Sequence, residues 1–262
     1  MFAFKWIIKT FLLVPFVLLG LPAAADCGFT RGLPKVAIAS VADGDTLRTT
    51  TGDRLRLVGI NTAELGRDGA ADEPLARQAR QAAQDFVNSS QTLYWRAAPG
   101  GKDRYGRLLG EIYNGAGSSL SAALLRSGLG FYIAVAPLPQ WAACLQRAED
   151  EARSANLGVW REPFWRARAA SDLSAADTGF VRIQGRITHI TVQAKLSWIE
   201  LDGPVVLRLP VKLSTGQQRE WQGRRVEVAA WLVDRSNSKA AKSGYKPLLV
   251  NLGDDSALRF TD

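Results

Sequence analysis

The chain is poor in the residues that bind transition metals. It contains one histidine, His189, and two cysteines, Cys27 and Cys144, among 262 residues. Zinc centres are built from several histidine and cysteine ligands, so this composition argues against one. A metal bound by this chain is therefore expected to be held by oxygen atoms, which suit Ca²⁺ or Mg²⁺.

Acidic residues are in deficit. The chain has 25 Asp and Glu against 33 Lys and Arg, which gives a formal net charge of +8 and a pI near 9.8. Such a charge favours a polyanionic partner, namely nucleic acid, an anionic membrane surface or an anionic polymer. The alternative is an exported protein that is basic without such a partner.

Long hydrophobic runs are scarce, and the one near the N-terminus, Phe11 to Leu21, is short for a membrane span. It follows two lysines and precedes three alanines. This pattern predicts a signal peptide over residues 1–25 that is cleaved before Asp26. We therefore expect an exported protein, periplasmic or extracellular, without stable membrane insertion. An uncleaved anchor is the alternative.

The two cysteines would enter an oxidising compartment after export, where a disulfide is permitted. A bond between Cys27 and Cys144 would tether the mature N-terminus to a distant helix. In the loop-entropy model such a bond stabilises the fold by about 4–5 kcal/mol. Two free thiols are the alternative, because a sequence does not show proximity.

The first half of the chain predicts an α+β domain over residues 26–165. Strands are expected over 35–41, 46–48, 55–60, 92–96 and 108–113, and helices over 74–87, 120–126 and 140–155. The first three strands are joined by tight turns, which is typical of a barrel rather than of a βαβ unit. We expect a five-stranded barrel of OB type with three helices.

The second half predicts a different composition of elements. Residues 166–178 are expected to be a linker, and residues 179–262 an all-β domain. Its strands are expected over 181–187, 196–201, 205–209, 226–231 and 248–252. Five short strands over this length suggest a second small OB-like barrel.

Basic and aromatic residues in the second domain allow two interpretations. They are Lys212, Arg219, Arg224 and Arg225, with Trp198, Trp221 and Trp231. They would form a face for single-stranded nucleic acid, as OB barrels often do. Alternatively, the tryptophans belong to the core and the basic side chains are simply solvated, which is the interpretation we favour.

Acidic residues of the first domain gather near one turn and one strand end. Asp43 and Asp45 lie in one turn, and Asn61 and Glu64 follow the third expected strand. In a three-stranded meander these two places can lie side by side. Clustered carboxylate and amide oxygens suit Ca²⁺ or Mg²⁺. Taken alone, however, an Asp-Gly-Asp triplet is more often a β-turn than a metal site.

Two arginines accompany these acids. Arg56 alternates with Leu55 and Leu57, so it is expected to point away from their face, toward solvent or a ligand. Arg107 closes a basic loop over 100–107. Guanidinium groups beside carboxylates can bind a phosphodiester bidentately and stabilise its transition state. Salt bridges between the arginines and the acids are the alternative, and spacing alone does not separate the two.

The full set of motifs resembles a known family. The segments are Val41-Ala42-Asp43-Gly44-Asp45-Thr46, Arg56-Leu57-Val58-Gly59-Ile60-Asn61-Thr62-Ala63-Glu64, Asp103-Arg104-Tyr105-Gly106-Arg107, the helix over 120–128 and Asn156-Leu157-Gly158-Val159-Trp160. In order and spacing they resemble the thermonuclease (staphylococcal nuclease) family over residues 35–160. The resemblance implies Ca²⁺-dependent endonucleolytic cleavage of DNA and RNA that leaves 3′-phosphates.

The resemblance also implies a site for one Ca²⁺ ion. Asp45 would be a direct ligand, with the side chain of Asn61 and the carbonyl of Thr62 beside it, and Asp43 would support the site. The family usually has aspartate at the position of Asn61. An asparagine offers an oxygen without a charge, so we expect weaker metal binding here.

The roles that the resemblance implies toward the substrate fall on five residues. Glu64 would orient or deprotonate the attacking water. Arg56 and Arg107 would bind the scissile phosphate and stabilise the transition state. Tyr105, with Arg104 next to it, would lie near the nucleotide.

A second departure from the family follows the helix over 120–126. The family's nucleotide-contacting tyrosines are not matched in register, and Ala134 and Ala136 stand there instead. Tyr132 is either a substitute for them or a core residue.

The sequence thus predicts an exported, monomeric nuclease with little sequence preference, whose partner is DNA or RNA as substrate. A catalytically weakened nucleic-acid-binding protein of the cell envelope is the main alternative, motivated by Asn61. A structural envelope protein whose basic surface contacts anionic polymers is a third.

Overall fold

The computed structural model describes Cys27, residues 31–134 and residues 139–262. The expected leader over 1–25, its cleavage point before Asp26 and Ala136 lie outside the described residues, so the signal peptide stays a prediction. Within the described ranges, no helix combines the length and the apolar character needed to cross a membrane.

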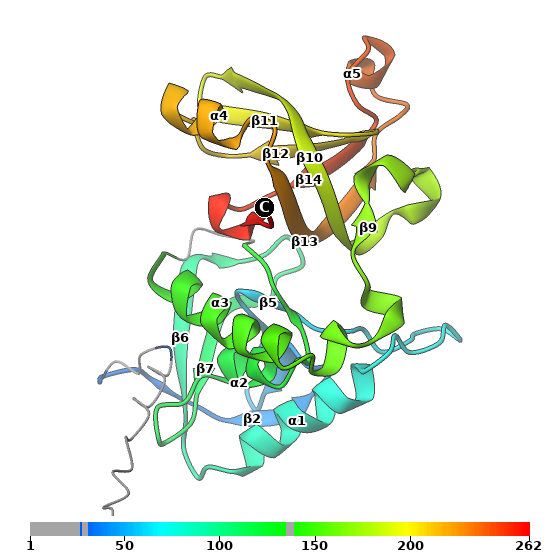
Figure 1. The fold of residues 1–262 in the computed structure, drawn as a ribbon. Helices are drawn as coiled ribbons and strands as arrows, with labels where there is room; N and C mark the ends of the chain where they lie inside the picture. Colours follow the sequence, from blue (N-terminus) through cyan, green and yellow to red (C-terminus); the bar gives the residue numbers. More distant parts are fainter. Residues whose placement is uncertain (1–26, 28–30, 135–138) are drawn as a thin grey trace, which may run out of the picture.

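Six strands of the first half form one sheet (Figure 1). They are β1 (Lys35–Val36), β2 (Ile38–Val41), β3 (Thr46–Thr49), β4 (Arg54–Leu57), β6 (Leu93–Lys102) and β7 (Leu108–Tyr113). The order is β1-β6-β7-β4-β3-β2. Because β1 and β2 follow one another in the chain, one bent segment joins both edges and the barrel is nearly closed.

Three helices accompany this barrel, each within two residues of its expected bounds. They are α1 (Ala76–Asn88), α2 (Leu120–Arg126) and α3 (Pro139–Ser154). The buried face of α1 consists of Ala76, Ala79 and Ala83, whose small side chains let the helix approach the sheet closely. The hydroxyl of Ser119 accepts a hydrogen bond from the Ala122 amide and begins α2.

The second half is a separate sheet. Its strands are β9 (Arg168–Ala169), β10 (Gly179–Gln193), β11 (Leu196–Leu201), β12 (Val205–Leu209), β13 (Arg225–Asp234), β14 (Leu248–Asn251) and β15 (Arg259–Phe260). The order is β15-β13-β14-β12-β11-β10-β9, and β13 also pairs with β10. That extra pairing closes β10, β11, β12, β14 and β13 into a five-stranded barrel. The five strands expected here are all present.

The two barrels share one connectivity. In each, three consecutive strands form a meander, and the third pairs in parallel with the fifth: β4 with β7, and β12 with β14. The fourth strand returns antiparallel to the first: β6 to β1, and β13 to β10. Each also has a helix between its third and fourth strands, which is α1 in the first half and α4 (Thr215–Trp221) in the second.

Several elements were not expected from the sequence. They are the two-stranded pair β5 (Ile60–Asn61) and β8 (Phe131–Tyr132), α4, α5 (Lys239–Lys242), and the 3₁₀ helices η1 (Gly158–Trp160), η2 (Pro163–Trp165), η3 (Ala170–Asp172), η4 (Ala175–Asp177) and η5 (Asp255–Ala257). They are short, so their hydrophobic periodicity is weak. The expected linker 166–178 contributes β9 to the second sheet, and its Ala170 and Leu173 belong to that barrel's core.

The two halves meet over an interface that combines apolar and charged contacts. An apolar cluster that includes Phe131 and Trp165 packs against Phe180 and Ala229 of the second barrel. Beside it, the Glu227 carboxylate of β13 accepts hydrogen bonds from Arg153 of α3 at 2.9 and 2.8 Å. The outer surface of β13 therefore lies on the first half.

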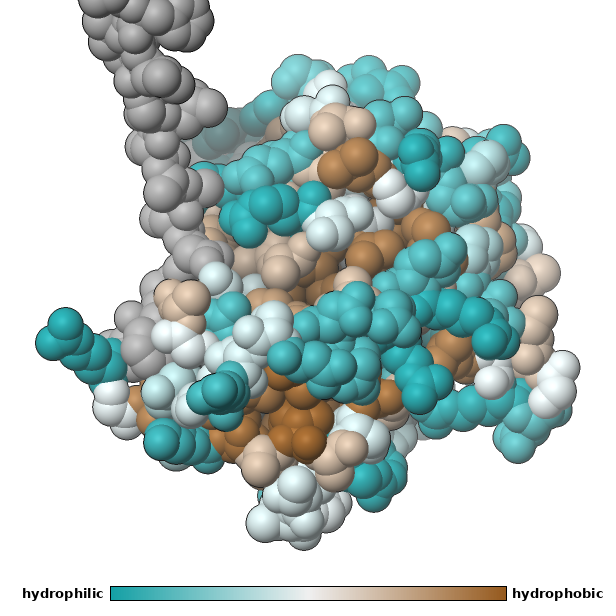
Figure 2. Space-filling model, turned by 90° about the horizontal axis from the view of Figure 1, so that it is seen from below, coloured by the Kyte–Doolittle hydropathy of each residue, from teal (hydrophilic) through white to brown (hydrophobic). Residues whose placement is uncertain are grey.

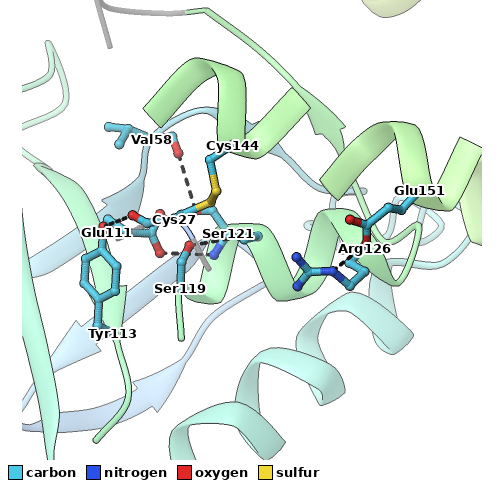
Figure 3. The surroundings of a disulfide bond; sticks show 10 residues. Cys27, Val58, Glu111, Tyr113, Ser119, Ser121, Arg126, Cys144 and Glu151 are labelled. Carbon is cyan, nitrogen blue, oxygen red and sulfur yellow. Dashed lines mark hydrogen bonds and ion pairs between the residues drawn. A yellow bond between two sulfur atoms is a disulfide. The ribbon is translucent and has the colours of Figure 1, made fainter. Parts of the chain in front are cut away.

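A disulfide joins Cys27 to Cys144 of α3, with the Cα atoms 5.3 Å apart (Figure 3). The Tyr113 hydroxyl donates to the Cys27 carbonyl at 3.3 Å, so Cys27 is also held against β7. Seen from below, the first half presents hydrophobic residues in patches between hydrophilic ones (Figure 2).

Candidate active site

The turn between β2 and β3 carries the two aspartates. Asp45 is fully buried, and its Oδ2 accepts hydrogen bonds from the backbone amide and the hydroxyl of Thr62 at 2.8 and 3.1 Å. Asp43 accepts from the Asp45 amide at 3.2 Å. The first turn and the end of the third strand therefore lie side by side, as the meander predicts.

Gly44 makes this approach possible. A Cβ at Gly44 would lie 2.8 Å from side-chain atoms of Thr62 and 2.8 Å from the Cβ of Ala79 in α1. Real side chains do not approach so closely, because the contact is well inside the van der Waals distance. Glycine at this position therefore lets the aspartate turn dock against both segments.

Arg56 lies at the centre of the cluster. It is 7% exposed and forms a buried ion pair with Asp45. Its Nη2 donates to the side-chain oxygen of Asn61 at 3.0 Å and to the Ile60 carbonyl at 3.2 Å. Burial and, next, the charge of Arg107 lower the pKa of Arg56 to about 10, so the guanidinium stays positive at neutral pH.

Asn61 is fixed by the unexpected strand pair. It belongs to β5 and pairs with Phe131 of β8, and it is 4% exposed. The side-chain oxygen of Asn61 and the carboxylate of Asp45 therefore converge on one positive group, the Arg56 guanidinium.

Glu64 stands at the mouth of this cluster with its side chain exposed. Its amide donates to a Glu73 carboxylate oxygen at 2.7 Å, which fixes the backbone. Partial desolvation and, next, the charge of Asp43 raise the pKa of Glu64 above its ordinary value. Burial likewise raises the pKa of Asp43. A carboxylate that is exposed and more basic than usual suits a proton acceptor.

The loop between β6 and β7 presents the second arginine. Asp103 organises it, because this carboxylate accepts from the Tyr105 amide at 2.8 Å and from the Arg107 Nε at 2.7 Å. Tyr105 is 61% exposed. The guanidinium carbons of Arg104 and Arg107 lie 4.9 and 5.6 Å from the Tyr105 ring centroid.

These residues open onto one cleft of about 1100 Å³. Its lining includes Arg56, Asn61, Glu64, Arg104, Tyr105, Arg107, Arg48, Arg54, Arg67 and Trp231. Asp43, Asp45 and Thr62 are buried behind this lining, with Asp45 paired to Arg56 and Asp43 near Arg67. The structure thus brings all predicted site residues of the first half together, apart from the cysteines of the disulfide.

Three arginines of the cleft were not predicted as site residues, and Trp231 was not predicted to lie at this site. Arg48 and Arg54 are register partners on β3 and β4, so alternation along these strands would have placed them together. Arg67 reaches within 3.9 Å of Asp43. Trp231 comes from the second barrel, and no pattern in the sequence links it to the first.

Among the residues that the structure describes, no three His, Cys, Asp or Glu side chains are grouped to hold a metal ion. The side-chain oxygen atoms in this cluster are nevertheless of the type that binds a hard cation. Oxygens of Asp45 and Asn61 already converge on a cation, the Arg56 guanidinium, and carboxylate and amide oxygens are ligands of Ca²⁺.

Comparison with known proteins agrees with this geometry. Residues 54–162 match the model of the family described as Staphylococcal nuclease homologue, which confirms the resemblance. The matched region includes Arg56, Glu64 and Arg107, whereas the turn with Asp43 and Asp45 precedes it.

The chain is also similar to three curated proteins over about half of its length. The chain is 29% identical over 134 residues to the SPbeta prophage-derived endonuclease YokF of Bacillus subtilis (strain 168), covering 50% of this chain and 45% of that protein. It is 27% identical over 134 residues to Endonuclease YncB of the same organism, covering 50% and 63%. It is 28% identical over 149 residues to the succinoglycan biosynthesis protein ExoI of Rhizobium meliloti (strain 1021), covering 55% and 73%. The chain therefore spans less than two thirds of the length of either endonuclease.

Proposed function

We propose that this chain, which carries a staphylococcal nuclease-like domain, hydrolyses phosphodiester bonds of nucleic acid. The main observation behind this proposal is that Arg56, Glu64 and Arg107 line one cleft, and that Asp45 is buried and paired with Arg56. A salt-bridge network alone would not need Glu64, whose carboxylate stays exposed. The two endonuclease relatives support the same class of reaction.

Each side chain has a distinct task in this reaction. Arg107 and Arg56 hold the scissile phosphate and balance the charge that grows on its oxygens as water adds. Glu64 orients the attacking water and accepts its proton. Tyr105, with Arg104 against its ring, lies beside the nucleotide. Asp103 keeps Arg107 aimed through its ion pair.

A Ca²⁺ ion is part of the proposal. Asp45, Asn61 and the Thr62 carbonyl would hold it, and Asp43 would support them from the neighbouring turn position. When bound, such an ion polarises the phosphate as a Lewis acid. Because Asn61 is uncharged, we propose that the affinity is lower than a two-carboxylate site would have.

The finer features are also proposals. We propose endonucleolytic cleavage of DNA and RNA with low sequence preference, an exported and monomeric protein, and domain limits at 26–165 and 179–262 with a linker between them. The connectivity that the two barrels share supports the view that both are of OB type.

A cleavage assay on the mature protein tests the proposal. Labelled DNA and RNA are incubated with Ca²⁺ or with EGTA, and products are resolved by size. We expect internal cleavage only with Ca²⁺, and a loss of at least about a hundredfold in Glu64→Ala. Glu220→Gln, which changes an exposed glutamate of the second barrel, serves as the control. Activity that persists unchanged in Glu64→Ala would show that the mechanism is wrong.

A nucleic-acid-binding protein without turnover is the second candidate. Asn61 favours it, and so does the buried Asp45–Arg56 pair, which occupies the oxygens that a metal would need. Binding of labelled DNA in Ca²⁺ without product over hours would support this candidate over the hydrolase.

A further inference from the structure

Trp231 is a large aromatic side chain of the second barrel that opens into the active-site cleft of the first. It is 41% exposed. A large aromatic ring with this much exposed surface at the edge of a cleft is available for contact with a ligand. On the same cleft lies Tyr105, which is 61% exposed. Two partly exposed aromatic rings therefore line one basic cavity.

The position of Trp231 follows from the alternation of β13. Its inward residues, such as Val228 and Leu232, fill the barrel core. Its outward residues face the first half: Glu227 bonds to Arg153 of α3, and Ala229 packs on the interface cluster. Trp231 is the next outward residue, so it emerges where the interface ends and the cleft begins.

The ring is held by other aromatic side chains. Trp231 packs edge-on against Phe180 with ring centroids 5.1 Å apart, and Phe180 lies 5.5 Å from Phe131. Phe131 is the strand partner of Asn61. A row of rings therefore connects the candidate metal-binding strand to Trp231. A ring fixed in this way loses little conformational entropy when a ligand stacks on it.

The positive charge around the Trp231 ring indicates a ligand with phosphate groups. Arg48, Arg54 and Arg67 line the same cleft, and guanidinium groups attract a phosphate backbone. An exposed ring beside a basic track is the combination that binds single strands, since every base offers a flat face. In a duplex both faces of a base are already covered by its neighbours, so a fixed ring has nothing to stack on.

We propose that Trp231 stacks on an unpaired nucleobase of the strand whose phosphate lies at Arg56 and Arg107, so that the second barrel directs the site to single-stranded nucleic acid. This inference rests on the proposed function, because it assigns the base next to the phosphate that is cleaved. It makes Trp231 a substrate-binding residue and gives the second barrel a part in substrate choice.

Steady-state cleavage separates this role from a structural one. The substrates are a labelled single-stranded oligonucleotide and the same strand annealed to its complement, each in Ca²⁺. In Trp231→Ala we expect KM for the single strand to rise about tenfold, the usual effect of losing one base stack. We expect kcat to hold, and KM for the duplex to change less than about twofold. Trp231→Phe should keep most of the single-strand affinity.

Tyr245→Ala is the matched control, because Tyr245 is another exposed aromatic of the second barrel and lines a different cavity. Circular dichroism and the thermal midpoint verify that each variant is folded. Equal KM values in Trp231→Ala and Tyr245→Ala would overturn the proposal.

A wild-type protein that cleaves neither substrate would refute the hydrolase and leave the stacking measurable. The same labelled single strand is then titrated in Ca²⁺ and followed by fluorescence anisotropy. A Kd that rises about tenfold in Trp231→Ala alone supports stacking, and a Kd equal to that of Tyr245→Ala rejects it.

Discussion

The Nη2 atom of Arg56 lies 3.0 Å from the side-chain oxygen of Asn61. The same guanidinium forms a buried ion pair with Asp45. Arg56 therefore occupies the two side-chain oxygens that a Ca²⁺ ion would take from this cluster. In the proposed reaction, metal binding would compete with the guanidinium, and a guanidinium displaced from these oxygens would become available to a phosphate.

The first prediction concerns this competition. Asn61→Asp adds one negative charge that both cations feel, but a divalent ion gains twice as much from it as a guanidinium does. We expect Ca²⁺ affinity to rise on the order of tenfold or more, with a matching gain in cleavage at low Ca²⁺. Isothermal titration calorimetry with CaCl₂ measures the affinity directly.

Asn237→Asp is the control for added charge, because Asn237 lies on an exposed part of the second barrel. An unchanged Ca²⁺ affinity in Asn61→Asp would show that Asn61 does not face the metal.

Much of the site was predictable because it is local in sequence. The turn of Asp43 and Asp45, the strand with Arg56 and the segment ending at Glu64 are joined by short connections, so a meander brings them together with few alternatives. The parallel partner β7 then carries the loop with Arg107 to the same end of the barrel.

The rest was not predictable because it depends on contacts between distant segments. β5 and β8 are two residues each, and neither forms without the other. Trp221 ends the polar helix α4 and yet is buried in the barrel core, whereas Trp231 lies among apolar residues of β13 and yet is exposed in the cleft. Only the docking of β13 on the first half decides between the two interpretations of these tryptophans. The four basic residues and three tryptophans that the sequence grouped into one candidate nucleic-acid face therefore do not share one environment.

The second prediction concerns that docking. Glu227 is 7% exposed and pairs with Arg182 and Arg153. Glu227→Gln would leave both guanidinium groups without a counter-charge, which costs about 3 kcal/mol of unfolding free energy at neutral pH. We also expect weaker single-strand binding, because Trp231 is placed by the same strand. Urea unfolding and anisotropy measure the two effects.

The pH dependence of this cost has a defined sign. Burial tends to raise the pKa of Glu227, but its hydrogen bonds with Arg153 and the charge of Arg182 outweigh it and lower the pKa below the ordinary value. The ionised carboxylate therefore stabilises the fold above its unfolded pKa, and this is lost as the pH falls through the folded pKa. The cost of Glu227→Gln should be larger at pH 7 than at pH 3, and equal costs would contradict the role of the charge.

The third prediction concerns the disulfide. Cys27 and Cys144 are 117 residues apart in sequence, so the bond closes a long loop in the unfolded chain. Replacing both by serine should lower the unfolding free energy by about 2–5 kcal/mol. Urea unfolding with and without a reductant provides the measurement. The reductant should destabilise the wild type and leave the double variant unchanged. Two titratable thiols in the native, air-oxidised protein would show that the bond does not form.

The last prediction concerns Glu111 of β7, a carboxyl group that the proposed reaction does not use. It is 2% exposed and lies near Ser121 (Figure 3). Its Oε1 accepts from the amides of Ser121 and Ile112 at 3.1 Å each. Burial raises the pKa of Glu111 to about 7, despite these hydrogen bonds. Between its unfolded value, 4.5, and about 7, the native state binds more protons than the unfolded state. Stability contributed by this group is therefore complete below pH 4.5 and is lost as the pH rises toward 7.

Glu111→Gln keeps an acceptor oxygen at this position and removes the titration. We expect the unfolding free energy of the wild type, relative to this variant, to fall between pH 4.5 and pH 8 by at most about 3 kcal/mol. Urea unfolding of both proteins across this range tests it, and taking the difference cancels the other titrating groups that the two proteins share. Glu220→Gln should follow the wild-type profile, because its side chain is 65% exposed. If the unfolding free energies of wild type and Glu111→Gln run parallel across this range, Glu111 titrates alike in the native and unfolded states, and the raised pKa is wrong.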